Sequence, residues 1–354
     1  MLMPDKYRQI SIEELSARIH AVKAKLGKKL VILGHHYQRD EVLEFADFRG
    51  DSFGLSKVAA EQEDAKYIVF CGVHFMAEAA DILTAEHQIV HIPEMSAGCP
   101  LADFANLVTV SEAWEEIIGV VPDVKITPIT YINSTAGLKA FCGKNNGTVC
   151  TSSNAAQILE WALKNSDKVF FFPDQFLGSN TANKLGIEAN KKIIWDSTLP
   201  LGGNSHQQIE NAKVILWKGY CHVHSWFKLE HIASFRRQFP GGKVIVHPEC
   251  PEEIVNAADA DGSTSQIISY VKSAPKGSTV AVGTEINLVN RLSNETKDKT
   301  VLPLARSLCP NMYKINLHNL CFTLENLGQK NIVHVPADIA RDASLALERM
   351  LTLS

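Results

Sequence analysis

Three short stretches of the chain share one layout: LVILGHHYQ at residues 30–38, ITPITYINS at 126–134 and KVIVHPE at 243–249. In each, a run of mainly β-branched and other apolar residues ends in polar residues, which predicts a buried strand with polar groups at its carboxyl end. Each stretch is followed by a segment rich in Ser, Thr or Gly and then by residues with helical periodicity; these segments are GDSFGLS, CTSSNAAQ and GSTSQ, from residues 50, 150 and 262. The chain therefore repeats a strand–helix unit three times.

The repeat continues beyond these helices. A second apolar run follows in each copy, at residues 67–75, 168–176 and 279–287, and a third run ends on Cys99, Cys221 and Cys309 in turn. Alternation of strands and helices predicts parallel sheets covered by helices on both faces. We therefore expect an α/β fold of three αβα sandwich domains related by pseudo-threefold symmetry around a central site.

The spacing of the copies sets the expected domain boundaries. The first domain is expected at residues 1–107, joined by the helical C-terminal stretch 310–354, the second at 108–221 with an insertion near 190–211, and the third at 222–309. A chain of 354 residues is long enough for two or three hydrophobic cores of this kind.

Composition excludes several classes of protein. A hydrophobic content of 45% with 21% charged residues is typical of a globular protein and argues against a disordered one. The net charge of −4 gives no positive surface for nucleic acid or for an anionic membrane. Because no apolar run reaches the roughly 18–20 residues that cross a bilayer, and the start MLMPDKYRQI lacks the pattern of a signal peptide, we expect a cytoplasmic protein with small-molecule ligands.

The eight cysteines are too few for a disulfide scaffold and contain no CxxC pair. Cys99, Cys221 and Cys309 end equivalent runs, so threefold symmetry would let their thiolates share one ligand. Three thiolates leave one metal position without a protein ligand, which in an iron–sulfur cluster means one iron that is open to substrate. Zinc, held by the thiolates with His222 or His224, is the inorganic alternative, and simple packing of the cysteines is the other. The five remaining cysteines have no threefold counterpart and are expected in the core; they are Cys71, Cys142, Cys150, Cys250 and Cys321.

The polar residues at the strand ends form the candidate site, because ligands of parallel sheets bind beyond the carboxyl ends of the strands. Period-two alternation places the members of each pair on one side: His35 with Tyr37, Tyr131 with Asn133, and His247 with Glu249. His36 is then expected to face away. Hydroxyl groups at the predicted helix starts suit carboxylate or phosphate oxygens, or else they only cap the helices; these residues are Ser52, Ser152, Ser263 and Thr264.

These motifs, in their order, resemble the quinolinate synthase family over nearly the whole chain. The resemblance is carried by GHHYQ, GDS, SAGCPLAD, YINSTA, CTSSNA, WKGYCHVH, HPECP, GSTSQ and SLCPNMYK. It implies three αβα domains around a pseudo-threefold axis, with a [4Fe–4S] cluster held by Cys99, Cys221 and Cys309. It also implies a dehydrating condensation of iminosuccinate with dihydroxyacetone phosphate to quinolinate, phosphate and two waters in NAD biosynthesis. Because this reaction has no net redox change, the open iron is expected to act as a Lewis acid, and an aspartate oxidase is a possible donor of the imine.

The resemblance also implies roles for single residues. His35 and Tyr37 are expected to handle protons, and Glu249 to act as a general base. The expected substrate-binding residues are His35, Ser52, Tyr131, Asn133, Ser152, His222, His247, Glu249, Ser263 and Thr264. Asp174 is assigned no chemistry. A zinc hydrolase and a non-enzymatic iron–sulfur sensor or scaffold are the competing functions.

Overall fold

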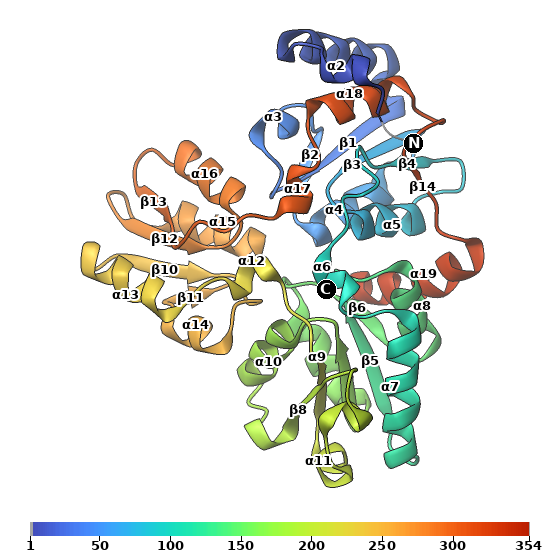
Figure 1. Cartoon of the computed structure of the whole chain (residues 1–354), viewed down its shortest axis with the longest axis vertical. Coiled ribbons are helices and arrows are strands. Elements are labelled where there is room, and N and C mark those ends of the chain that lie inside the picture. Colours follow the sequence, from blue (N-terminus) through green and yellow to red (C-terminus); the bar gives the residue numbers. More distant parts are fainter. Residues whose placement is uncertain (1–2, 354) are drawn as a thin grey trace. The chain divides into compact units, whose positions relative to one another are not determined.

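The computed structural model describes residues 3–353, which form two compact units (Figure 1). Unit 1 contains the described residues up to Cys99 together with Leu308–Pro336. Unit 2 contains Pro100–Ser307 and the described residues from Ala337 onward.

Unit 1 is built on one five-stranded sheet. The strands are β1 (Leu30–His35), β2 (Phe48–Gly50), β3 (Tyr67–Cys71), β4 (Ile89–His91) and β14 (Ile332–Val333), in the order β14-β4-β3-β1-β2. All neighbours are parallel except β14 with β4, and Ile32 of β1 lies opposite Val69 of β3. Every residue of β1 is buried, as expected for a central parallel strand. The helices α2 (Ile12–Leu26) and α18 (Leu317–Glu325) pack together on one face, and α4 (Ser52–Glu61) and α5 (His74–Leu83) on the other (Figure 1).

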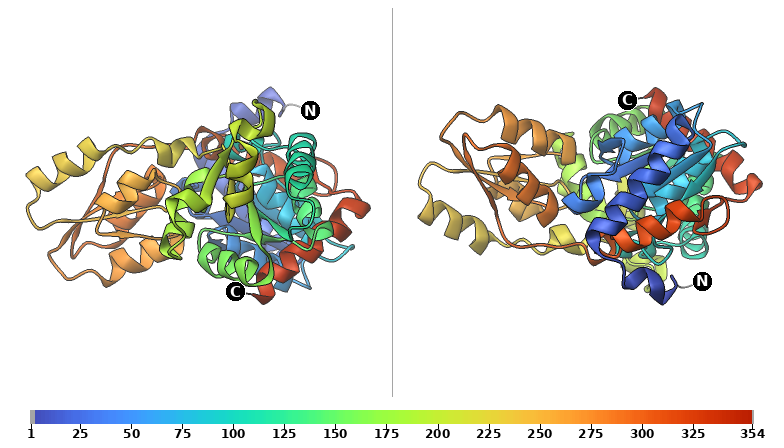
Figure 2. Two further views of the ribbon diagram at one scale, coloured as in Figure 1. Left: turned by 90° about the horizontal axis from the view of Figure 1, so that it is seen from below. Right: turned by 90° about the horizontal axis from the view of Figure 1, so that it is seen from above.

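Unit 2 contains two sheets, both entirely parallel. The first has β5 (Ile126–Tyr131), β6 (Thr148–Cys150), β7 (Lys168–Phe172), β8 (Lys192–Trp195) and β9 (Val214–Trp217), in the order β6-β5-β7-β9-β8. The second has β10 (Lys243–Val246), β11 (Ala260–Asp261), β12 (Thr279–Gly283) and β13 (Thr300–Pro303), in the order β11-β10-β12-β13. The β10 sheet lies between α15 (Thr264–Ser273) with α16 (Ile286–Glu295) and α13 (Leu229–Gln238) with α14 (Glu252–Ala257), as Figures 1 and 2 show.

The three sheets share one strand order. Four strands of each are arranged β4-β3-β1-β2, β9-β7-β5-β6 and β13-β12-β10-β11, so that the first strand of each copy lies between the second and the third. This order confirms the α/β class and three parallel-rich sheets. The strand β8 and the helix α11 (His206–Asn211) are additional to the shared order, as is β14. The pseudo-threefold arrangement around an axis stays a prediction.

The C-terminal stretch divides between the units, which differs from the expectation that residues 310–354 as a whole join the first domain. Leu308–Pro336 belongs to unit 1, but α19 (Ala337–Thr352) belongs to unit 2, where it packs on α8 (Ala136–Lys144). The two backbones approach so closely that a Cβ at Gly143 would lie 1.8 Å from the carbonyl oxygen of Asp342. Periodicity predicts an amphipathic helix here, but it carries no information on which sheet the helix covers.

No helix within the described range 3–353 is both long and apolar enough to span a membrane.

Candidate functional site

The strand ends of unit 2 bring polar residues from both of its sheets together. Tyr131 is the last residue of β5, His247 directly follows β10, and Thr284 directly follows β12. In sheets of this strand order, neighbouring central strands diverge at their carboxyl ends and leave room for a ligand. The site therefore lies where the fold class predicts it.

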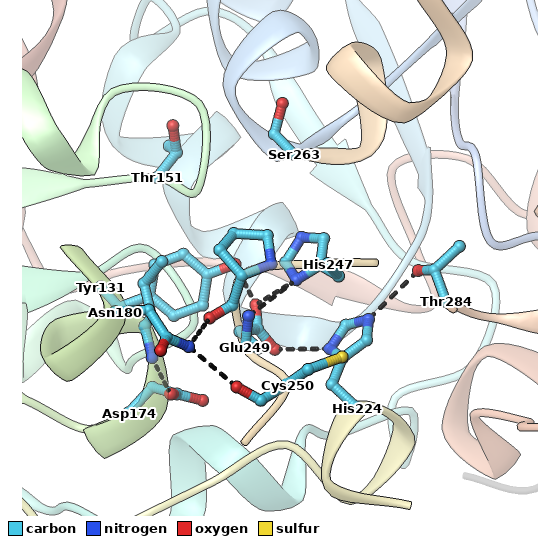
Figure 3. Close-up of polar contacts among 12 residues, drawn as sticks. Tyr131, Thr151, Asp174, Asn180, His224, His247, Glu249, Cys250, Ser263 and Thr284 are labelled. Carbon is cyan, nitrogen blue, oxygen red and sulfur yellow. Dashed lines mark hydrogen bonds and ion pairs between the residues drawn. The ribbon is translucent and has the colours of Figure 1, made fainter. Parts of the chain in front are cut away.

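A buried chain of hydrogen bonds runs through this site, centred on Glu249 (Figure 3). The Tyr131 hydroxyl donates to Glu249 Oε1 at 2.5 Å, and Glu249 Oε2 lies 2.9 Å from Nδ1 of His224. Nε2 of His224 lies 3.1 Å from the Thr284 hydroxyl. The His247 ring stacks on the His224 ring with centroids 4.2 Å apart. All five side chains are at most 5% exposed, so the network is shielded from bulk water.

The electrostatics of the network favour an ionised Glu249. Burial alone would raise the pKa of this carboxyl group, but the adjacent His224 and His247, with hydrogen bonds from His224 and Tyr131, lower the pKa to about 2. Asp174, which caps the start of α10 (Gln175–Lys184), shows the opposite shift, since burial and the nearby Glu249 carboxylate raise its pKa well above the ordinary value. Glu249 is therefore ionised at neutral pH and can accept hydrogen bonds through both carboxylate oxygens.

His224 belongs to this network, while substrate binding by His222 stays a prediction. With Nδ1 against a carboxylate and Nε2 against a hydroxyl, both ring nitrogens of His224 are engaged within the protein. His222 lies half-buried at the start of α12 (His222–Ser225), with its Nε2 atom buried. The sequence contained a usable signal, because a residue three positions after Cys221 in a helical turn lies on the same face as that cysteine.

Unit 1 contains a matching pair at the end of β1. The backbone N–H of Tyr37 donates to Nδ1 of His35 at 3.1 Å, and the two rings make an edge contact with centroids 4.8 Å apart. The Glu249 N–H donates to Nδ1 of His247 at 3.3 Å in the same way. The residue three positions after each histidine also donates its N–H to the histidine carbonyl, at 2.9 Å in unit 1 and 3.0 Å in unit 2. The first and third copies therefore share one strand-end turn.

The predicted anion-binding hydroxyls occupy different positions at the helix starts. Ser52 is the first residue of α4, while Asp51 caps that helix through a 2.8 Å bond from Gly54 N–H. Ser263 is the N-cap of α15, accepting a hydrogen bond from Gln266 N–H within a capping box, and Thr264 follows it. The Ser263 hydroxyl therefore caps this helix, which is the alternative to anion binding that the sequence left open.

The second copy presents its polar residues from two loops. Ser152 lies half-buried in the turn before α9 (Ala155–Asn165), a turn organised by Asn154, whose side chain accepts from Thr151 N–H at 2.7 Å. Asn133 is half-buried after β5, and its Oδ1 atom is buried with no hydrogen-bond partner among the described residues. A buried acceptor of this kind is suited to a bound donor group.

Cys99, Cys221 and Cys309, here named the strand-end cysteines, differ from the other five. Each is half-buried and directly precedes a four-residue helix: α6 (Pro100–Asp103), α12 or α17 (Pro310–Tyr313). The other five are buried, and burial raises the pKa of every one of their thiols. No cysteine within residues 3–353, which include all eight, forms a disulfide.

The strand-end cysteines each supply a sulfur donor. Thiolates are soft ligands that favour zinc and iron–sulfur clusters. The Cys221 sulfur lies within 4.8 Å of ligand atoms of His224 and Glu249, but the ring nitrogens of His224 are already engaged. Within unit 1, the Lys314 ammonium donates to the Ser96 carbonyl at 2.6 Å and so links the two segments that carry Cys99 and Cys309.

Comparison with known proteins identifies the family of this chain. Residues 17–352 match the NadA family model, described as quinolinate synthetase A protein. A quinolinate synthase of Herpetosiphon aurantiacus is 49% identical over 99% of this chain and 95% of that protein. Those of a Geobacillus species and of Rhodopirellula baltica are 48% and 47% identical, over 99% and 98% of this chain and 97% and 93% of the respective relatives. The chain therefore belongs to the quinolinate synthetase A family of enzymes.

Proposed function

We propose that this enzyme condenses iminosuccinate with dihydroxyacetone phosphate to form quinolinate, phosphate and two waters. The observation that carries the proposal is the buried Tyr131–Glu249–His224–Thr284 chain, found at the strand ends of a member of this family. The condensation needs proton transfers, loss of phosphate and two dehydrations, and an ionised carboxylate hydrogen-bonded to a phenol and an imidazole is suited to moving protons. The dicarboxylate substrate also requires groups that bind anions.

The strand-end cysteines would hold a [4Fe–4S] cluster. Their partial exposure, their shared position before a short helix and the engaged ring nitrogens of His224 support this assignment. When bound, such a cluster supplies a Lewis acid at the iron that has no protein ligand.

The remaining site residues divide between proton transfer and substrate binding. Glu249 would act as the general base, with His224 and Thr284 orienting its carboxylate. His35 and Tyr37 would move protons in the later dehydration. The groups that would bind substrate are His35, Tyr131, Asn133, His222, His247, Glu249 and, at the helix starts, Ser52, Ser152, Ser263 and Thr264. Helix N–H groups and hydroxyls at such starts favour carboxylate and phosphate groups.

The same proposal places the enzyme in NAD biosynthesis in the cytoplasm. An enzyme that oxidises aspartate would supply the imine, and an aspartate oxidase would be the partner that transfers it. No nucleic acid or membrane enters this scheme.

The test is anaerobic turnover. Purified protein is mixed with enzymatically generated iminosuccinate and dihydroxyacetone phosphate, and quinolinate and phosphate are quantified over time. The expected result is equal amounts of both products; protein with a full complement of iron that forms no quinolinate would refute the proposed function. A colourless, oxygen-tolerant protein with about one zinc per chain would favour a zinc enzyme instead.

A further inference from the structure

Glu249 lies in a short loop, His247–Cys250, that joins β10 to the segment leading into α14. Two N–H groups of the loop bond back to His247: that of Glu249 to the ring and that of Cys250 to the carbonyl. Proline at 248 has no N–H, so this part of the loop has few internal bonds to hold it. Pro248 and Cys250, the residues before and after Glu249, both have a backbone carbonyl that accepts a hydrogen bond from outside the loop.

Both of these carbonyls are bound by one side chain from the other sheet's helices. Nδ2 of Asn180, in α10, donates to the Pro248 carbonyl at 2.9 Å and to the Cys250 carbonyl at 2.8 Å (Figure 3). A primary amide has two N–H groups, and here both are used. Since both partners are carbonyl oxygens, only this orientation of the amide satisfies them.

The helix that carries Asn180 is itself fixed in place. Asp174 caps its first turn by accepting from Leu177 N–H at 2.7 Å, and the Gln175 N–H donates to the Gly219 carbonyl at 2.9 Å in the loop before Cys221. The helix packs on α14, and Lys184 forms an ion pair with Asp261. Asn180 is only 3% exposed, so its two bonds are shielded from bulk water.

We propose that Asn180 is a positioning residue of this enzyme, which fixes the His247–Cys250 loop and thereby the carboxylate of Glu249 against Tyr131 and His224. The proposal rests on the proposed function only through the role of Glu249. Displacing a reacting group by about 1 Å can lower the rate on the order of 100-fold. The rate should therefore depend strongly on the hydrogen bonds that hold the loop on both sides of Glu249. Asn180 itself touches backbone, not substrate.

The test compares Asn180→Ala and the milder Asn180→Ser with Asn183→Ala as a matched control. Asn183 lies on the same helix, but its side-chain oxygen accepts from Lys192, which is outside the loop. Asn180→Ala should lower kcat at least about 10-fold and change KM by less than about threefold. The kcat of Asn180→Ser should lie between those of Asn180→Ala and the wild type. The kcat of Asn183→Ala should equal that of the wild type. A wild-type kcat in Asn180→Ala, or an equal loss in the control, would overturn the proposal.

A double-substitution cycle separates positioning from general destabilisation. If Asn180 acts through Glu249, adding Asn180→Ala to Glu249→Gln should leave the residual turnover unchanged. It should also leave the Kd for quinolinate unchanged. A merely structural role predicts the same additional loss in both backgrounds, and that result would contradict the proposal.

Hydrogen exchange of the holoenzyme provides a measurement that does not depend on the reaction. In Asn180→Ala, the Glu249 and Cys250 amides should exchange at least about 10-fold faster while the strands of both sheets keep their protection. Unchanged exchange at these amides would refute the proposal. Absence of quinolinate formation by the wild type would refute the proposed function instead, and the exchange result would then decide the role of Asn180 in holding the loop.

Discussion

Replacing Glu249 with Gln removes the charge of the base and keeps its shape. In the structure the carboxylate accepts from the Tyr131 hydroxyl at 2.5 Å and faces Nδ1 of His224 at 2.9 Å. The amide has a single acceptor oxygen, so it can serve one of these partners as an acceptor and must present its N–H groups to the other. If the amide N–H faces His224, the His224 proton must lie on the nitrogen facing Thr284; if it faces Tyr131, the hydroxyl must accept instead of donating.

The expected loss in kcat is about 10²–10⁴-fold, which is the range for removing a general base and corresponds to roughly 3–5 kcal/mol of barrier. Stability should fall much less. Two charge-assisted bonds become neutral ones at about 1 kcal/mol each, partly offset because a buried charge is removed. The variant should therefore fold and keep its iron.

The assay is the initial rate of quinolinate formation under anaerobic conditions, with iron content and melting temperature measured on the same samples. Glu253→Gln is the matched control, since Glu253 is exposed on α14 four residues further along. Because the pKa of Glu249 is held near 2, its ionisation should not contribute a fall in kcat/KM between pH 8 and pH 5. If Glu249→Gln kept more than half of the wild-type kcat with normal iron, the assignment of Glu249 as the base would be wrong.

Three further substitutions test other parts of the structure. Replacing any one strand-end cysteine with serine should abolish iron binding, whereas Cys142→Ala should retain the iron. Iron and sulfide are measured after anaerobic purification. Equal iron content in all variants would contradict the ligand assignment. Thr284→Val removes the hydroxyl at Nε2 of His224 and should lower kcat about 10-fold, with Thr284→Ser restoring it; an unchanged rate would exclude an orienting role. Hydrogen bonds from Arg18 lower the pKa of Glu325, so this carboxylate stabilises the fold above its ordinary pKa near 4.5, and the stabilisation is lost as the pH falls through the lowered value. Glu325→Gln should therefore reduce the free energy of unfolding by about 1 kcal/mol at pH 7 but by less at pH 4 in urea titrations, and a loss independent of pH would contradict this.

Much of the fold was predictable because the strand signal is local. Apolar runs that end in polar residues marked the central strand of each sheet, and the repeat indicated three of them. Where α19 packs depends instead on the close approach of Gly143 to another helix, which no periodicity records. The start of α4 was also ambiguous, since both Asp51 and Ser52 are good caps, and the structure uses the aspartate.

Site residues could be predicted from the sequence only where they lie at the end of a predicted strand. Tyr131, His247 and Glu249 were found in this way, and the structure brings them together. Thr284 and Asn180 were not selected, and His224 was considered only as a zinc ligand. Each of the three acquires its role from a partner in another element, and sequence does not show the pairing of β10 with β12 or the packing of α10 on α14. A sequence motif shows which residues are neighbours along the chain, and not which side chains complete a hydrogen-bond network.

The most direct measurement is Mössbauer spectroscopy of anaerobic, ⁵⁷Fe-loaded protein with and without quinolinate. We predict about four irons per chain, of which one subsite alone changes its isomer shift and quadrupole splitting when quinolinate is added, because only that iron lacks a cysteine ligand. Four irons that all ignore the ligand, or a protein whose bound metal is a single zinc, would contradict a three-cysteine cluster with an open iron.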